Sequence, residues 1–211
     1  MARPATAVRL TALVVGAAYA GALYLSGVHL QAGWKQGLSY LPSAAVLLVT
    51  LWDTWLWRQP GVHRFARRPL LAGTWRATLK PTDDSHIPDG GNRGPIEAYV
   101  IINQSYWSIT VRQYTHESRS NSKAVLWTTE AGGGTTALTY TYRNNPKQEY
   151  ESRSRAHLGT AALDVVGDQP QSLDGYYFTD RYTKGDMSLR FFDRSVSHAD
   201  FQAVSLHCRG T

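Results

Sequence analysis

The chain has 211 residues and a formal net charge of +6 at pH 7, and 43% of its residues are hydrophobic. A mean hydropathy of −0.33 excludes a protein that crosses a membrane many times, and an aromatic content of 11% excludes a wholly disordered chain. Because Cys208 is the single cysteine, no disulfide can form within the chain.

The positive charge is concentrated near the N-terminus. Residues 1–70 carry seven basic side chains and one acidic side chain, whereas residues 71–211 carry fifteen of each. A domain that binds DNA or RNA needs a basic face, so the neutral second part argues against a nucleic-acid polymer as partner and leaves only a local basic patch for such contacts.

Two apolar segments fall within residues 1–60. Residues 10–28 contain no charge, and residues 38–57 contain one, Asp53. Nineteen helical residues span a hydrocarbon core of about 30 Å. The pattern therefore predicts two transmembrane helices at these positions, followed by a basic linker over residues 61–70.

The basic residues around the two helices predict their orientation. Arg3 and Arg9 resemble the start of a signal peptide, but the first apolar run is longer than a usual signal and a second follows at once. Lys35 alone lies between the helices. By the positive-inside rule, we expect a multi-pass membrane protein with both termini and the following domain in the cytoplasm.

Two features of the predicted hairpin carry functional alternatives. Small residues four apart on the first helix, Gly16 with Ala20 and Ala17 with Gly21, let another helix approach closely, either within the hairpin or in an oligomer. Asp53 lies near the end of the second helix among tryptophans. It is either a carboxylate at headgroup depth or a polar group that promotes helix association or a membrane lesion.

Alternating hydrophobicity predicts an all-β domain over residues 71–193, followed by a C-terminal tail over 194–211. Eight short strands in meander order favour an up-and-down, lipocalin-like β-barrel, because closure removes both sheet edges; a two-sheet sandwich is the alternative. The Gly73-x-Trp75 pair matches the first strand of lipocalin-like barrels, in which the tryptophan plugs the closed end. The predicted strands are Gly73–Lys80, Ile96–Gln104, Tyr106–His116, Ala124–Glu130, Thr136–Arg143, His157–Val166, Ser172–Arg181 and Asp186–Phe192.

The loops of such a barrel alternate between its two ends. Long polar loops collect at the end away from Gly73, whereas tight turns, including Gly132–Gly134, collect at the other end. A small barrel can hold one ligand at an open mouth. Arginines there can pair with phosphate, and aromatic rings can stack on bases. The candidate ligand-binding residues are Tyr114, Ser118, Tyr140, Tyr142, Arg143, Asn144, Thr179, Arg181 and Tyr182.

No motif for catalysis or for a resident cofactor stands out. The chain has no phosphate-binding loop of the Walker type, no nucleophile elbow and no dinucleotide fingerprint. The histidines show no zinc-ligand spacing. The sequence therefore predicts a non-enzymatic protein with no catalytic residue and no metal site.

Three stretches, Tyr140–Pro146 (YTYRNNP), His157–Gly159 (HLG) and Gly175–Gly185 (GYYFTDRYTKG), together with the two helices, resemble a known family. It is the two-transmembrane, β-strand-rich effectors of bacterial cyclic-oligonucleotide-based anti-phage signalling (CBASS), and the resemblance covers nearly the whole chain. It implies a minimal barrel that binds a cyclic dinucleotide made by a partner nucleotidyltransferase. It also implies a location in the bacterial inner membrane, self-association on binding, disruption of that lipid bilayer and abortive infection.

Two other functional classes are consistent with a membrane-anchored barrel. A lipocalin-like carrier of an apolar ligand predicts an interior lined by aliphatic side chains, with the arginines turned outward. A structural or adaptor protein predicts an exposed apolar patch and no pocket. The Thr, Tyr and Arg residues on the strands favour the nucleotide-like ligand over the apolar one.

Overall fold

The computed structural model describes residues 4–25, 40–66, 68–129 and 136–210. The chain divides into two compact units. The first comprises Met1–Arg68 with Ser105–Ser108, and the second comprises Pro69–Gln104 with Ile109–Thr211.

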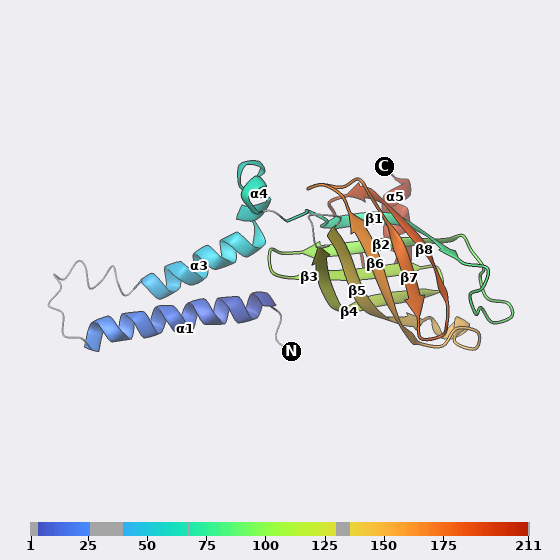
Figure 1. Cartoon of the computed structure of the whole chain (residues 1–211), viewed down its shortest axis with the longest axis horizontal. Helices are drawn as coiled ribbons and strands as arrows, with labels where there is room; N and C mark the ends of the chain where they lie inside the picture. The colour runs from blue at the N-terminus through green and yellow to red at the C-terminus, as the bar shows by residue number, and fades with distance from the viewer. Residues whose placement is uncertain (1–3, 26–39, 67, 130–135, 211) are drawn as a thin grey trace. The chain divides into compact units, whose positions relative to one another are not determined.

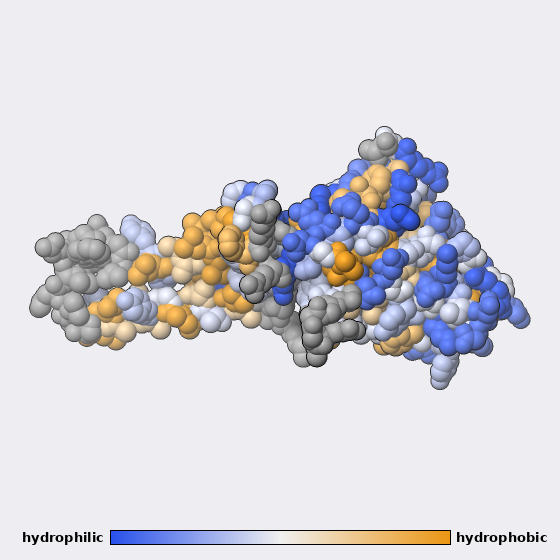
Figure 2. Space-filling model, turned by 45° about the horizontal axis from the view of Figure 1, so that its top comes forward, coloured by the Kyte–Doolittle hydropathy of each residue, from blue (hydrophilic) through white to orange (hydrophobic). Residues whose placement is uncertain are grey.

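The first unit is helical. It contains α1 (Pro4–Leu25), α3 (Leu41–Thr54), the 3-10 helix η1 (Leu56–Arg58) and α4 (Pro60–Ala66). Residues Thr6–Leu25 are long and apolar enough to cross a membrane. Apolar residues cover much of the surface of α1 and α3, whereas the surface of the strand-rich unit is mainly hydrophilic (Figure 2).

The helix bounds differ from the predicted ones. The first helix begins six residues before the predicted start at Leu10, and the second ends at Thr54 instead of Trp57, because the backbone tightens into η1. Residues 26–28 and 38–39 of the predicted helices lie outside the described residues. The predicted linker over 61–70 begins with most of α4.

Close packing and one ion pair hold the helical unit together. A Cβ atom added at Gly16 would lie 2.9 Å from the Pro42 Cα of α3, so Gly16 serves packing within the hairpin. Asp53 is buried, and its carboxylate accepts hydrogen bonds from Arg9 at 2.9 Å and from the Trp107 N–H at 3.1 Å. The carboxylate therefore has partners in its own chain.

The second unit is a closed antiparallel barrel in which each strand pairs with its neighbours in sequence and β1 pairs with β8 (Figure 1). This confirms the predicted up-and-down barrel and excludes the sandwich. The strands are β1 (Gly73–Pro81), β2 (Ile96–Gln104), β3 (Ile109–Thr115), β4 (Ser118–Thr129), β5 (Thr136–Pro146), β6 (His157–Val165), β7 (Ser172–Thr179) and β8 (Lys184–Asp193).

The strand bounds differ most at β3 and β4. Residues 105–108 form the turn before β3, in which the Ser105 N–H donates to the Ser108 carbonyl at 2.7 Å, so the strand starts three residues late. β4 starts six residues early because it stays paired with β5 through a bulge between Ser122 and Ala124. The Gly132–Gly134 turn and Glu130 lie outside the described residues.

The barrel interior is filled by side chains from alternate strand positions, such as Val100, Leu138 and Leu163, all fully buried. Trp75 closes the end at which β1 begins. It is completely buried, its Nε1–H donates to the Leu71 carbonyl at 3.0 Å, and its ring meets Phe191 edge-on at 5.2 Å. The expected tryptophan plug is therefore present.

The C-terminal tail contains a helix that the sequence analysis left out, α5 (Phe201–Arg209). Asp200 caps it, because its Oδ1 accepts a hydrogen bond from the Ala203 N–H at 2.8 Å. Val204 and Cys208 pack against Ile101 and Tyr114 on the outer face of the barrel.

Candidate functional site

The long loops at the end opposite Trp75 surround a cavity of about 430 Å³. Leu79 and Ile96 give it an apolar wall, and the remaining wall is largely polar. The volume falls within the range of small-ligand sites in proteins. Its polar and aromatic lining residues include Glu97, Gln113, Glu117, Ser118, Tyr142, Asn144, Arg153, Ser154, His157, Tyr177, Arg181, Phe201 and Arg209.

Tyr142, which points into the barrel from β5, lines the cavity. The Tyr142 ring packs on Gly159. A Cβ atom at position 159 would collide with the ring, so glycine leaves the space that the ring occupies. Tyr140 packs beneath, with ring centroids 6.0 Å apart. Burial raises the pKa of Tyr142 and that of Tyr177, the latter to about 12, so both hydroxyls stay neutral donors at physiological pH.

Two polar atoms on the cavity wall lack partners among the described residues. Asn144 donates from Nδ2 to Ser118 Oγ at 3.1 Å, but its Oδ1 accepts nothing. Arg181 donates from Nη1 to Ser154 Oγ at 3.4 Å, but its Nε–H has no acceptor. A buried polar atom without a partner costs about 1–3 kcal/mol, so these atoms are suited to bind a polar ligand.

The charged groups on the wall leave a small positive excess. Burial lowers the pKa of Arg181, but an arginine remains cationic because its ordinary pKa is far above neutrality. The charged lining residues are the acids Glu97 and Glu117 and the cations Arg153, Arg181 and Arg209.

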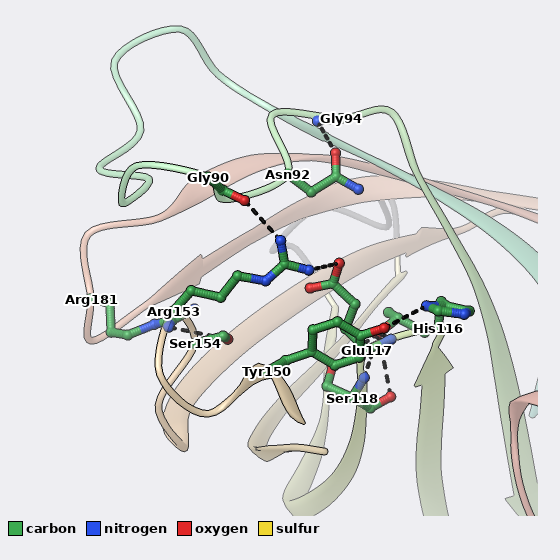
Figure 3. A network of polar contacts seen from close by, with 11 residues as sticks. Gly90, Asn92, Gly94, His116, Glu117, Ser118, Tyr150, Arg153, Ser154 and Arg181 are labelled. Carbon is green, nitrogen blue, oxygen red and sulfur yellow. Dashed lines mark hydrogen bonds and ion pairs between the residues drawn. The ribbon is translucent and has the colours of Figure 1, made fainter. Parts of the chain in front are cut away.

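A polar network joins three loops at the rim (Figure 3). Arg153 donates to Glu117 at 2.7 Å and to the Gly90 carbonyl at 2.9 Å, and its guanidinium lies 4.8 Å from the centre of the Tyr150 ring. The Tyr150 hydroxyl lies 3.4 Å from His116 Nδ1. Arg153 neutralises Glu117, so this ion pair leaves the guanidinium of Arg181, with its unused Nε–H, available to a ligand in the cavity.

The structure brings four of the predicted ligand-binding residues together on the cavity wall: Ser118, Tyr142, Asn144 and Arg181. Tyr140 lies below them in the core. Thr179 shapes the β7–β8 turn, because its Oγ1 accepts the N–H groups of Arg181 and Thr183 at 3.3 Å each.

Three predicted residues lie away from the cavity wall. Tyr114 points outward from β3 and is buried under α5, which corrects its expected place at the mouth. Arg143 is exposed and follows the inward-facing Tyr142, so it lies on the outer face of β5. Tyr182 is 82% exposed at the tip of the β7–β8 turn, where its φ is +63°.

Sequence reasoning missed Gln113, Arg153 and His157. Gln113 lies two residues after the buried Val111 on β3, so its inward direction could have been found from the period of two. Arg153 reaches the rim from a loop, and its position depends on the contact with Glu117.

The burial of His157 predicts that the stability of the protein depends on pH. Burial lowers its pKa below the ordinary value, so the folded state binds fewer protons than the unfolded state. We therefore expect the melting temperature to fall as the pH drops from about 7.5 to about 5.5 through the unfolded-state pKa of about 6.5. His157→Gln should flatten this fall in part, because burial also lowers the pKa of His198. An unchanged pH profile in differential scanning fluorimetry would contradict this role.

Comparison with known proteins identifies the family. The sequence profile of the Cap15 cyclic dinucleotide receptor domain matches residues 66–190, which is more than half of the chain. The chain belongs to the Cap15 family. It is also 28% identical over 160 residues to CD-NTase-associated protein 15 of Staphylococcus schleiferi, covering 76% of this chain and 81% of that protein.

The Cap15 match confirms the resemblance to CBASS effectors with a β-barrel, and it names a receptor domain instead of an enzyme. The matched residues include most of the barrel, in which the cavity lies, and exclude α5. The cavity also disfavours an adaptor without a pocket, and the inward Arg181 disfavours a carrier of apolar ligands.

Proposed function

We propose that this Cap15-family chain is a membrane-anchored anti-phage effector whose cavity binds a cyclic dinucleotide, and that binding drives self-association and membrane disruption. The observation that carries the proposal is the polar cavity at the open end of a barrel matched by a cyclic dinucleotide receptor profile. The nucleotide would come from a partner nucleotidyltransferase of the infected cell.

The wall of the cavity fits the chemistry of this ligand. A cyclic dinucleotide carries two phosphates and two bases. The guanidinium of Arg181 can donate to a phosphate through its unused Nε–H, and the free Oδ1 of Asn144 can accept from an exocyclic base amine. Leu79 and Ile96 offer apolar surface to the bases, and the Tyr142 hydroxyl offers a neutral donor.

The helical unit supplies the membrane part of the proposal. α1 is long enough to span a bilayer, and we assign α3 as the second arm of a hairpin with both termini and the barrel in the cytoplasm. Gly16 packs against Pro42, whereas none of the described residues lies within 4 Å of a Cβ atom added at Gly21. We therefore assign Gly21 to the contact between neighbouring hairpins.

The test uses the full chain reconstituted in vesicles that contain a fluorescent dye. We expect one member of a cyclic-dinucleotide panel to bind, measured by calorimetry, and to release the dye only when the protein is present. Binding follows from the cavity, and release follows if the ligand favours the assembled state. No heat from any member of the panel would contradict the binding step.

Gly21→Leu separates binding from assembly. The larger side chain should keep hairpins apart, so we expect normal ligand affinity with dye release reduced at least about 10-fold. Gly61→Leu on α4 is the matched control, because a Cβ atom there also meets no atom of the described residues within 4 Å, and it should release dye normally. Equal release by the two variants would remove Gly21 from the assembly interface.

A further inference from the structure

Three side chains with metal-binding atoms meet beside α5, outside the residues matched by the family profile. Asp193 ends β8, His198 lies in the segment that follows, and His207 lies in the last turn of α5. One donor atom from each lies within 4.8 Å of the others. The three residues therefore converge from separate parts of the chain.

Hydrogen bonds among the described residues do not explain why the side chain of His198 is buried. Its side chain is buried, with 9% of the residue exposed, and its Nε2 has no hydrogen-bond partner among the described residues. Its ring lies 4.7 Å from the ring of His207. An imidazole nitrogen buried without a partner is costly, and a bound ion next to His207 would satisfy it.

The surrounding backbone holds the cluster in place. The Ser195 N–H donates to Asp193 Oδ1 at 3.0 Å. Arg112 reaches across from β3 and donates to the Val196 carbonyl at 2.7 Å and to the His198 carbonyl at 3.4 Å. These contacts fix the segment that carries His198, so little conformational entropy is lost when a ligand binds there.

We propose that Asp193, His198 and His207 bind a divalent transition-metal ion of the zinc type. Two imidazoles and one carboxylate suit Zn²⁺ with a fourth position open to water, and they do not suit Mg²⁺ or Ca²⁺, which prefer oxygen donors. The side chains of Asp193 and His207 are 31% and 35% exposed, which gives the ion a path from solvent.

Binding requires a small local rearrangement. His207 Nε2 now contacts Asp193 Oδ2 directly. The ion replaces the proton that lies between these two atoms, and this proton is released to solvent. Metal–donor distances of about 2.0–2.2 Å place the donors roughly 3.3 Å apart, and side-chain rotation of His198 and His207 brings them to that spacing.

The ion would tie α5 to the end of β8. Because Phe201 and Arg209 of the same helix line the ligand cavity, the site would also hold one wall of that cavity in position. The metal site itself requires no cyclic dinucleotide, so it can be tested separately from the proposed function.

The test uses the tag-free full chain in detergent, stripped with a chelator and then titrated with Zn²⁺. We expect about one ion per chain, and a rise in melting temperature of several degrees at saturating zinc. In His198→Ala, His207→Gln and Asp193→Asn, zinc affinity should fall at least about 10-fold. Co²⁺ added to the unmutated protein should give the visible absorption bands of a bound ion with nitrogen ligands.

His86→Ala is the matched control, because His86 is exposed and lies in the β1–β2 loop away from the cluster. It should bind zinc like the unmutated protein. The proposal is overturned if the unmutated protein binds no zinc and shows no cobalt bands, or if the three variants bind zinc as tightly as the control. The cobalt measurement stands even if a variant fails to fold. If the proposal is overturned, Asp193 and His207 form only a hydrogen-bonded pair beside the buried His198.

Discussion

Arg181→Ala should weaken binding of the cyclic dinucleotide by about 10- to 150-fold, because hydrogen bonds to charged groups contribute roughly 1.5–3 kcal/mol. The guanidinium lines the cavity and donates a long hydrogen bond to Ser154 at 3.4 Å, and its Nε–H has no acceptor among the described residues. The unliganded protein therefore loses little when the side chain is removed, whereas the complex loses a phosphate contact. Calorimetry with the full chain measures the difference.

Two further variants distinguish a direct contact of the Arg181 guanidinium with the ligand from an effect of positive charge alone. Arg181→Lys keeps the positive charge but loses the planar fork, so its affinity should fall between those of the unmutated protein and Arg181→Ala. Arg143→Ala removes an exposed arginine from the outer face of β5, next to Tyr142 and Asn144, and should bind normally. If Arg143→Ala and Arg181→Ala weaken binding equally, the effect is long-range electrostatics and not contact within the cavity.

The barrel could be predicted because its cause is local. The period of two along each strand determines which side chains face inward, and the turn and loop signals between successive strands, with no helix between them, indicate the meander order. Ile96–Gln104 matches the predicted strand in full for this reason. The Trp75 plug was predicted in another way, from the resemblance of the Gly73-x-Trp75 pair to the first strand of lipocalin-like barrels.

The candidate site could be predicted only in part, because it also depends on contacts between distant segments. Tyr142 and Asn144 follow the inward phase of β5, and both line the cavity. Tyr114 was misplaced because α5 covers the outer face of the sheet at β2 and β3 and makes that side apolar. Two signals in the sequence indicate α5: the capping residue Asp200, and the helical spacing of Phe201, Val204 and Cys208 after it.

Arg153 and His198 mark the limit of inference from the sequence. Arg153 belongs to the rim because it pairs with Glu117, which is 36 positions away. His198 meets Asp193 and His207 only because α5 folds back onto the barrel. Neither contact follows from spacing along the chain, since loop paths of this length are determined by tertiary packing.

Trp75→Ala should produce the largest loss of stability, with the free energy of unfolding lowered by about 3–5 kcal/mol. The side chain is fully buried at the closed end, packs edge-on against Phe191, and satisfies the Leu71 carbonyl. Alanine would leave a cavity and a buried acceptor without its donor. The melting temperature of the full chain should fall by roughly 10 °C or more.

Trp75→Phe and Trp55→Ala make this test specific. Phenylalanine restores most of the volume but not the Nε1–H, so it should lose less stability than alanine. Trp55 lies in the helical unit and is 57% exposed, so Trp55→Ala should leave the barrel transition unchanged. If Trp75→Ala leaves the free energy of unfolding nearly unchanged, the Trp75 side chain contributes little to the stability of the barrel.

Trp75→Ala and Arg181→Ala should change different properties, the first stability and the second ligand affinity. Trp75 lies at the end of the barrel opposite the cavity, so Trp75→Ala should keep its ligand affinity at temperatures well below its melting point. Arg181→Ala should keep its melting temperature, because the side chain contributes one long hydrogen bond to the fold. If Trp75→Ala instead loses affinity while still folded, the closed end and the cavity are coupled through Tyr140 and Met187, which lie between them in the core.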